Sequence, residues 1–368
     1  MSIVCGEIID FFEGFAPLRL AEEWDNVGLI IGNRNEEVNR LMLCLDVTSD
    51  VVDEAVSKKI NMIVSHHPFL FKGLKRISGD SAKTRIIYKL IKNDINVYCA
   101  HTNLDVAKGG INDCLAGILE LTDVTSLNKY RGEKFYKLVV FVPEDSTDIV
   151  RNAISDAGAG HIGKYSDCTF SVKGIGTFRP LEGTNPYIGS KGNLEKVVEY
   201  RIETIVPCGI LEKVIINMVK AHPYEEVAYD VYPLEMEDER YGLGNIGLLK
   251  ESKSFDEFTK IVKQKLEIDT IRVIGSPPKK VRKVAVFCGS FDGNWASIMN
   301  NKADVLITGD IKYHTAMEAL EMGLCILDAG HFATERIIIP RLDSMLKERF
   351  PTLEVIRNSA EKSPFKTI

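Results

Sequence analysis

Five of the seven histidines in this chain of 368 residues lie just after apolar segments that are predicted to be strands. His66 and His67 end the segment "NMIVSHHP", where Pro68 favours a bend. At such a bend two adjacent side chains can turn toward a common space instead of pointing to opposite faces of a sheet. Because imidazole is the commonest side-chain ligand for metal ions, the pair indicates a metal site; for the pair alone, a polar loop beside the sheet is the alternative.

The same combination of residue types recurs at other strand ends. His101 follows "INVYCA" with Asp105 four residues later, and His331 follows "CILDAG" with Glu335 four residues later. Positions i and i+4 share one face of a helix, so each pair can offer an imidazole and a carboxylate to one ion. Because ligands bind beyond the carboxyl ends of strands in open α/β sheets, we expect these side chains to form one metal site.

Other residues near these motifs are candidates for catalysis or substrate binding. His314, four residues after Asp310, is predicted to be a general acid or base, with a helix-surface histidine as the alternative. His101 is predicted to carry protons, to bind a metal weakly or to support the ligands; a strand-end histidine bonded to the backbone is the alternative. Trp24 and Asp25 in "EEWDNVGL" are candidates for the mouth of the pocket, and a simple turn is the alternative.

The strands that carry these residues belong to two regions of the chain. Residues 1–128 alternate near-continuous apolar strands, such as "INVYCAH", with helical segments, which is typical of a parallel sheet covered on both faces. Residues 237–368 repeat this order and are predicted to end in one long helix over residues 333–350. Because the candidate ligands come from both regions, we expect the two regions to form one split α/β domain.

Residues 129–236 show a different order of elements. The strand "YKLVVFVP" is followed by a helix, two strands, a second helix and a last strand, "EVAYDVYPL". This βαββαβ order is typical of a ferredoxin-like fold. Since candidate ligands lie on both sides of this region, we expect it to be a domain inserted into the α/β domain.

Composition narrows the class of protein. Hydrophobic residues make up 45% and charged residues 27%, as in globular proteins, and no apolar run is long enough to span a membrane. The N-terminal segment is predicted to be an amphipathic helix and not a signal peptide, and eight scattered cysteines without a C-x-x-C motif fit reduced thiols in the cytoplasm. The net charge of -6 argues against general binding of nucleic acid.

Four motifs, "EEWDNVGLIIG", "IVSHHP", "AHTNLDVAKGG" and "DAGHFATE", together resemble one known family. It is the family named after the yeast NGG-interacting factor three, widely labelled GTP cyclohydrolase I type 2 homologue. The middle region is similar to its bacterial long form through "GAGHIGKYSDCTFSVKGIGTF" and "AHPYEEVAYDVYPL". The resemblance implies a dinuclear metal centre, a toroidal homohexamer built as a trimer of dimers, and an inserted domain similar to PII and CutA proteins. It assigns His66, His67, Asp105 and His331 as metal ligands and Glu335 as a bridging carboxylate.

The resemblance further implies a metal-dependent hydrolase in which metal-activated water opens the guanine ring of GTP. Alternatives are a phosphoesterase acting on a nucleotide or another phosphate ester, and a non-catalytic toroidal scaffold or small-molecule sensor. Nitrogen and oxygen ligands suit two divalent ions per chain, with zinc expected and iron or manganese as alternatives. Two ligand carboxylates do not neutralise the charge of two divalent ions. The remaining positive charge suits an anionic small molecule or nucleotide. We expect Asp105 to share one ion with His67.

Overall fold

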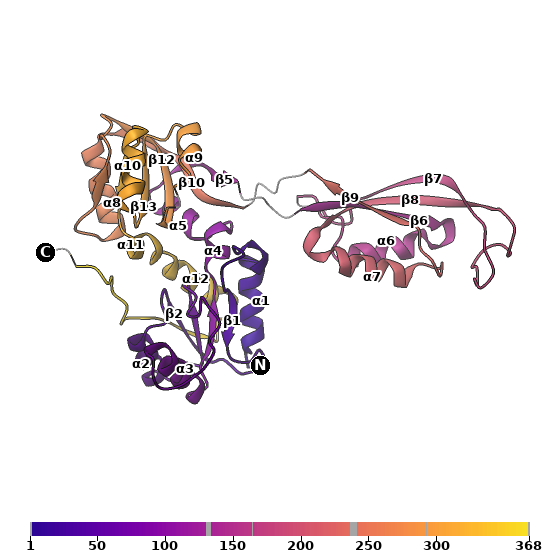
Figure 1. Cartoon of the computed structure of the whole chain (residues 1–368), viewed down its shortest axis with the longest axis horizontal. Coiled ribbons are helices and arrows are strands. Elements are labelled where there is room, and N and C mark those ends of the chain that lie inside the picture. Colours follow the sequence, from indigo (N-terminus) through magenta and orange to yellow (C-terminus); the bar gives the residue numbers. More distant parts are fainter. Residues whose placement is uncertain (1, 130–133, 164, 236–240, 292, 367–368) are drawn as a thin grey trace. The chain divides into compact units, whose positions relative to one another are not determined.

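The chain folds into two compact units, and the first is built from both ends of the sequence. Unit 1 comprises Met1–Tyr130 and Glu239–Ile368, and unit 2 comprises Arg131–Asp238 (Figure 1). The computed structural model describes residues 2–129, 134–163, 165–235, 241–291 and 293–366.

The first sheet of unit 1 carries the strand that leads to the paired histidines. Its strand order is β1-β4-β3-β2-β15, and all neighbours are parallel except β1 and β4. Every residue of β3 and β4 is buried, as the continuous apolar runs predicted. The strands are β1 (Gly28–Ile31), β2 (Arg40–Cys44), β3 (Met62–Ser65), β4 (Asn96–Cys99) and β15 (Glu354–Arg357).

The second sheet of unit 1 has the order β11-β14-β13-β12-β10-β5, in which β12, β13 and β14 are parallel and the other pairs are antiparallel. On either side of the insertion, β5 and β10 pair with each other, with Lys129 opposite Gly242. The strands are β5 (Thr122–Lys129), β10 (Gly242–Lys253), β11 (Arg272–Ile274), β12 (Val281–Ser290), β13 (Val305–Gly309) and β14 (Ile326–Asp328).

One hydrophobic core joins the two sheets of unit 1. Leu41 and Val64 of the first sheet and Val284 and Ile307 of the second belong to the same buried cluster. Capping side chains fix where two of the surrounding helices begin, Thr48 for α2 and Ser81 for α3. The helices in the first half are α1 (Cys5–Phe15), α2 (Ser49–Ser57), α3 (Ala82–Lys92), α4 (Thr102–Val106) and α5 (Ile111–Ile118); those in the second half are α8 (Phe255–Leu266), α9 (Trp295–Asn300) and α10 (Tyr313–Glu321).

The prediction of one long helix over residues 333–350 is wrong, because the segment forms two helices. The short α11 (His331–Glu335) is separated by a turn from α12 (Ile338–Arg349). Pro340 has no N–H to donate to the Arg336 carbonyl, and Ile339 N donates to that oxygen instead, at 3.2 Å. The break leaves His331 and Glu335 on a helix of their own, directly after β14.

Unit 2 is an antiparallel sheet with two helices. Its elements follow one another in βαββαβ order, and the strand order is β7-β8-β6-β9. Both helices lie against the same face of the sheet, where they bury Val140, Ile202 and Val214 (Figure 1). The similarity of this unit to PII and CutA proteins stays a prediction. The elements are β6 (Phe135–Pro143), α6 (Thr147–Asp156), β7 (Thr169–Phe178), β8 (Glu195–Pro207), α7 (Leu211–Ala221) and β9 (Tyr229–Leu234).

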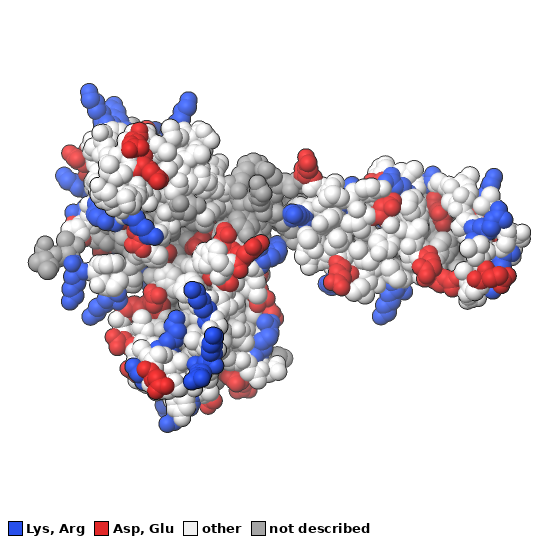
Figure 2. Space-filling view, viewed as in Figure 1, with Lys and Arg blue, Asp and Glu red and all other residues white. Residues whose placement is uncertain are grey.

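The surface carries charges of both signs. On the face shown in Figure 2, Lys and Arg side chains occur near Asp and Glu side chains over both units. Within the described residues, no helix is both long and apolar enough to cross a membrane. The eight cysteines form no disulfide, and five of them are buried.

Candidate metal centre

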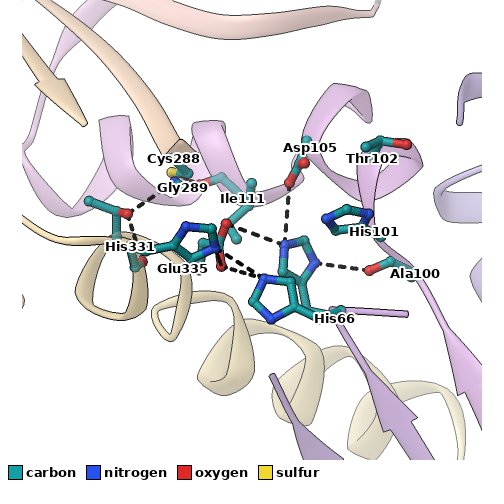
Figure 3. Close-up of polar contacts among 12 residues, drawn as sticks. His66, Ala100, His101, Thr102, Asp105, Ile111, Cys288, Gly289, His331 and Glu335 are labelled. Atoms are coloured by element: carbon teal, nitrogen blue, oxygen red, sulfur yellow. Dashed lines mark hydrogen bonds and ion pairs between the residues drawn. The ribbon is translucent and has the colours of Figure 1, made fainter. Parts of the chain in front are cut away.

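The candidate site lies at the carboxyl ends of β3, β4 and β14 in unit 1. His66 and His67 follow β3, Asp105 lies on α4 after β4, and His331 and Glu335 lie on α11 after β14. Figure 3 shows the side chains of His66, Asp105, His331 and Glu335 gathered around a common space. The structure therefore brings together all five residues that the sequence motifs single out as metal ligands.

Glu335 stands between two groups of donor atoms. Its Oε2 lies 2.9 Å from Nε2 of His67 and 2.9 Å from Nε2 of His331, and these two nitrogens are 3.2 Å apart. Its Oε1 lies 3.7 Å from Nε2 of His66, and Asp105 Oδ1 lies 3.6 Å from the same nitrogen. The set of His67, His331 and Glu335 could hold a metal ion, and so could the set of His66, His67 and His101.

We expected Asp105 to share an ion with His67, and the structure places Asp105 beside His66 instead. Nδ1 of His66 is 2.9 Å from the Ala100 carbonyl at the end of β4, which turns the ring toward α4. Nδ1 of His67 is 3.0 Å from Asp46 Oδ1, at the end of β2, and the ring faces α11. The two adjacent histidines thus serve opposite sides of the site because their Nδ1 atoms bond to different strands.

Two further histidines are held in the same way. His331 Nδ1 lies 2.9 Å from Asp310 Oδ2, and His101 Nδ1 lies 2.9 Å from Asp25 Oδ2. Burial alone would raise the pKa of Asp25, but hydrogen bonds from His101 and Thr102 lower it to about 2, so its carboxylate stays ionised. In each histidine, a hydrogen bond at Nδ1 leaves Nε2 as the ligand atom, which is the usual arrangement behind metal-bound imidazoles.

Several buried atoms of the site lack a hydrogen-bond partner. Among the described residues six buried side-chain N or O atoms have none, and three of these are His66 Nε2, Asp105 Oδ1 and Glu335 Oε2. An unsatisfied buried polar atom costs about 1–3 kcal/mol, so three such atoms in one place call for bound partners. Cations between the two carboxylates and the imidazoles would satisfy all three, and the donor set therefore fits metal ions.

The electrostatics of the site point the same way. Burial raises the pKa of Asp105 well above its usual range, and the nearby charge of Glu335 adds to this. Burial also lowers the pKa of His66. For His67 burial is outweighed by the hydrogen bond to Asp46 and by the nearby charge of Glu335, which raise its pKa to about 10. A divalent cation would favour the ionised Asp105 and neutral imidazoles, the forms in which these groups bind metal.

Two glycines allow α11 to approach the second sheet. At Gly289, where φ is +66°, a Cβ atom would lie 2.1 Å from Glu335 Oε1, and at Gly309 it would lie 2.5 Å from His331 N. Sequence reasoning did not identify these two residues as part of the site. The signal that could have found them is a glycine at the end of a buried strand, in "FCGS" and "LITGD".

The remaining candidates fall in two places. His314 is exposed on α10 with its ring 5.3 Å from that of Tyr313, and it belongs to neither group of possible metal ligands; its catalytic role stays a prediction. Trp24 is 61% exposed and Phe71 is 47% exposed, and each ring stands edge-on to His101 at 6.0 Å between centroids. Because Trp24 and Phe71 are both exposed beside His101, they mark the accessible side of the site.

The sequence matches the family model described as Duf34/NIF3 (NGG1p interacting factor 3) over residues 3–364. A relative from Halalkalibacterium halodurans is 47% identical over 99% of both chains, and one from Bacillus subtilis is 42% identical over 98% of this chain and 97% of its own. Both relatives carry the name GTP cyclohydrolase 1 type 2 homolog.

Solved structures resemble the whole chain as well. A Bacillus cereus protein related to NIF3 is 45% identical, with a TM-score of 0.86 and full coverage of both chains. The Staphylococcus aureus protein SA1388 is 29% identical, with a TM-score of 0.82, and covers 100% of this chain and 99% of its own. Together with the family match over residues 3–364, these similarities show that the chain belongs to the Duf34/NIF3 (NGG1p interacting factor 3) family.

Proposed function

We propose that this protein is a metal-dependent hydrolase with two divalent ions per chain. One ion would be held by His67, His331 and Glu335, and the other by His66, Asp105 and Glu335. The observation that carries this proposal is the convergence of nitrogen and oxygen donors, three of them buried without a hydrogen-bond partner. The two possible metal-binding groups contain no cysteine, which suits zinc, our first choice, or iron or manganese.

Residues in and around the site connect its two sides, orient the ligands and hold a proton. When bound, such ions activate water and polarise the bond to be cleaved. Glu335 holds the two sides of the site together, and Asp46 and Asp310 fix the rings of His67 and His331. His101, fixed at Nδ1 by Asp25, keeps its Nε2 available to hold a proton at the edge of the site.

Charge does not select strongly for an anionic substrate. Two divalent ions would bring a charge of +4, but five carboxylates lie in or directly behind the site and bring -5 when all are ionised. The positive excess expected from the ligands alone is therefore cancelled by the carboxylates that support the histidines. The five are Asp25, Asp46, Asp105, Asp310 and Glu335.

Shape favours a planar substrate over a simple phosphate ester. Trp24 and Phe71 offer two exposed aromatic rings beside His101, and the Asn26 side chain donates to the Leu70 carbonyl, which ties the two segments together. Aromatic side chains stack on purine rings at about 1–3 kcal/mol per base. With the printed names of the relatives, this supports a GTP cyclohydrolase-type reaction, in which water opens the guanine ring.

The substrate can be tested by tryptophan fluorescence and by turnover. The chain has two tryptophans: Trp24 is 61% exposed, whereas Trp295 is 5% exposed and bonds to Glu318. We expect GTP, but not ribose 5-phosphate, to quench the fluorescence of metal-loaded protein, and the quenching to disappear in Trp24→Leu. Release of formate from GTP would then support the proposed reaction. Hydrolysis of phosphate esters alone would favour the phosphoesterase, and no turnover at all would favour the scaffold or sensor.

Family membership also supports a proposal about assembly. We propose a cytoplasmic homohexamer, a trimer of dimers with closed symmetry. Light scattering should then give about six times the chain mass of 41.1 kDa. A monomer at micromolar concentration would contradict this proposal without affecting the ligand assignment.

A further inference from the structure

The C-terminal segment, defined here as residues 358–361, is bonded to the edge of the metal centre. It follows β15, which pairs in parallel with β2, and Asn358 N continues this pairing by donating to the Leu43 carbonyl at 3.0 Å. The Glu54 carboxylate on α2 then accepts hydrogen bonds from Asn358 Nδ2 at 2.8 Å and from Ala360 N at 3.0 Å. The segment is therefore held in place before the chain reaches Glu361.

Glu361 contacts the backbone at the end of β2. Leu45 N donates to its two carboxylate oxygens, at 2.9 Å and 3.0 Å, and Asp46 N donates to Oε1 at 2.6 Å. Glu361 is partly buried, while Lys362 and the described residues after it are exposed. Among the described residues, Glu361 is therefore the last one that packs against unit 1.

The two residues that Glu361 holds are the ones that hold His67. The Leu45 carbonyl accepts from His67 N at 2.8 Å, and Asp46 Oδ1 lies 3.0 Å from His67 Nδ1. The preceding carbonyl, that of Cys44, accepts from His66 N at 3.2 Å. Both the backbone and the ring of His67 therefore depend on the Leu45–Asp46 segment, whereas the ring of His66 is fixed elsewhere, by the Ala100 carbonyl.

We propose that Glu361 is a positioning residue for the metal centre, which acts by fixing Leu45 and Asp46 and, through them, the ring of His67. Removing the Glu361 carboxylate frees two N–H donors and the side chain that orients His67. The loss falls on the side of the site formed by His67, His331 and Glu335. The side formed by His66 and Asp105 keeps its own support, so the proposal predicts selective weakening of one ion.

The test compares metal binding by full-length variants. Chelator competition with Zn²⁺ gives a dissociation constant for each ion, and the variants His331→Ala and Asp105→Ala identify which constant belongs to which side. We expect Glu361→Ala to weaken binding of the ion on the His67 side about tenfold. This is the lower end of the range for groups that support metal ligands. Glu361→Gln keeps one acceptor oxygen, so its dissociation constant for this ion should lie between those of Glu361→Ala and wild type. Lys362→Ala, an exposed neighbour, should match wild type.

The selectivity of the loss separates positioning from general stability. Thermal unfolding of the metal-free variants, followed by circular dichroism, reports stability independently. Unchanged constants for both ions in Glu361→Ala would overturn the proposal. So would equal weakening of both ions, because that result indicates a merely structural role, and so would a wild type that binds no ion here. None of these measurements uses turnover. The test of Glu361 therefore remains valid even if the proposed hydrolase activity is not found.

Discussion

His66 in unit 1 and His222 in unit 2 are both buried, yet only one of them is arranged to bind a metal. His222 uses both ring nitrogens within its own unit: Nε2 bonds to the Phe141 carbonyl at 3.0 Å, and Nδ1 accepts from Tyr224 N at 3.1 Å. His66 bonds through Nδ1, and its Nε2 has no hydrogen-bond partner. Burial alone does not identify a ligand, but a buried ring nitrogen facing carboxylates without a hydrogen bond does.

The direction of the strands in the two units explains the difference. In unit 1 the parallel strands β3 and β4 end on the same edge, so the residues that follow them converge. In unit 2 neighbouring strands run in opposite directions, and their ends do not gather side chains at one edge. His222 follows α7 and completes the hydrogen bonding of that unit instead.

Replacing Glu335 should have the largest effect, because its two oxygens face the two sides of the site. Glu335→Gln keeps the shape of the side chain but removes its charge, and we expect loss of most of both ions after dialysis. Glu348→Gln, the same change at an exposed position of α12, serves as the control and should retain the wild-type metal content. Mass spectrometry of metals gives the content, and two ions per chain in Glu335→Gln would refute the bridging role.

The two buried histidines provide the next test. His66→Ala should lose the ion assigned to the Asp105 side and keep the other. His222→Ala should keep both ions but lower the free energy of unfolding by about 1–3 kcal/mol, because the Phe141 carbonyl and Tyr224 N lose their partner. Metal analysis and denaturant unfolding of both variants test this contrast. Loss of metal from His222→Ala would contradict the expected contrast between the two histidines.

A smaller effect is expected where a glycine makes room for Glu335. Gly289→Ala places a Cβ atom 2.1 Å from Glu335 Oε1, so the carboxylate must move, and we expect metal binding to weaken about tenfold. Gly323→Ala is a matched control, because its φ of +71° is close to the +66° of Gly289 but nothing lies within 4 Å of the added atom. In both variants the positive φ lowers the free energy of unfolding by about 1–2 kcal/mol. Equal metal affinity in the two would show that the close approach has no role.

Removing unit 2 should leave the metal centre unchanged. Lys129 and Gly242 lie opposite each other on β5 and β10, so a short linker can join them in place of the intervening residues. The five assigned ligands all belong to unit 1. We therefore expect the shortened protein to carry the same metal content as the full chain. A folded, shortened protein without metal would show that the site depends on unit 2.

Local patterns in the sequence were enough to predict these strands and to single out the residues that gather at the candidate site. Buried strands such as β3 and β4 are continuous apolar runs, and the residues that follow them carry the donors. The i and i+4 spacing of His331 and Glu335 placed both on one face of α11, where Oε2 and Nε2 lie 2.9 Å apart. The same reasoning missed the break before α12, because apolar periodicity continued through the turn.

The residues that orient the ligands could not be predicted in the same way. Asp46 bonds to a histidine 21 residues away and Asp25 to one 76 residues away, so these contacts exist only once the strands are placed side by side. Asp310 lies four residues before His314 in the sequence, but the structure places Asp310 against His331. Glu361 lies 315 residues from Asp46 in the chain. Long-range contacts of this kind leave no periodic signal in the sequence.

The metal content of the wild-type protein tests the central claim most directly. Purified full-length protein should be loaded with excess Zn²⁺, dialysed, and analysed by mass spectrometry of metals against protein concentration. The proposed assignment, with Glu335 between two sets of donors, predicts two ions per chain. One ion per chain, or none, after loading in excess would contradict the dinuclear site and the hydrolytic mechanism built on it.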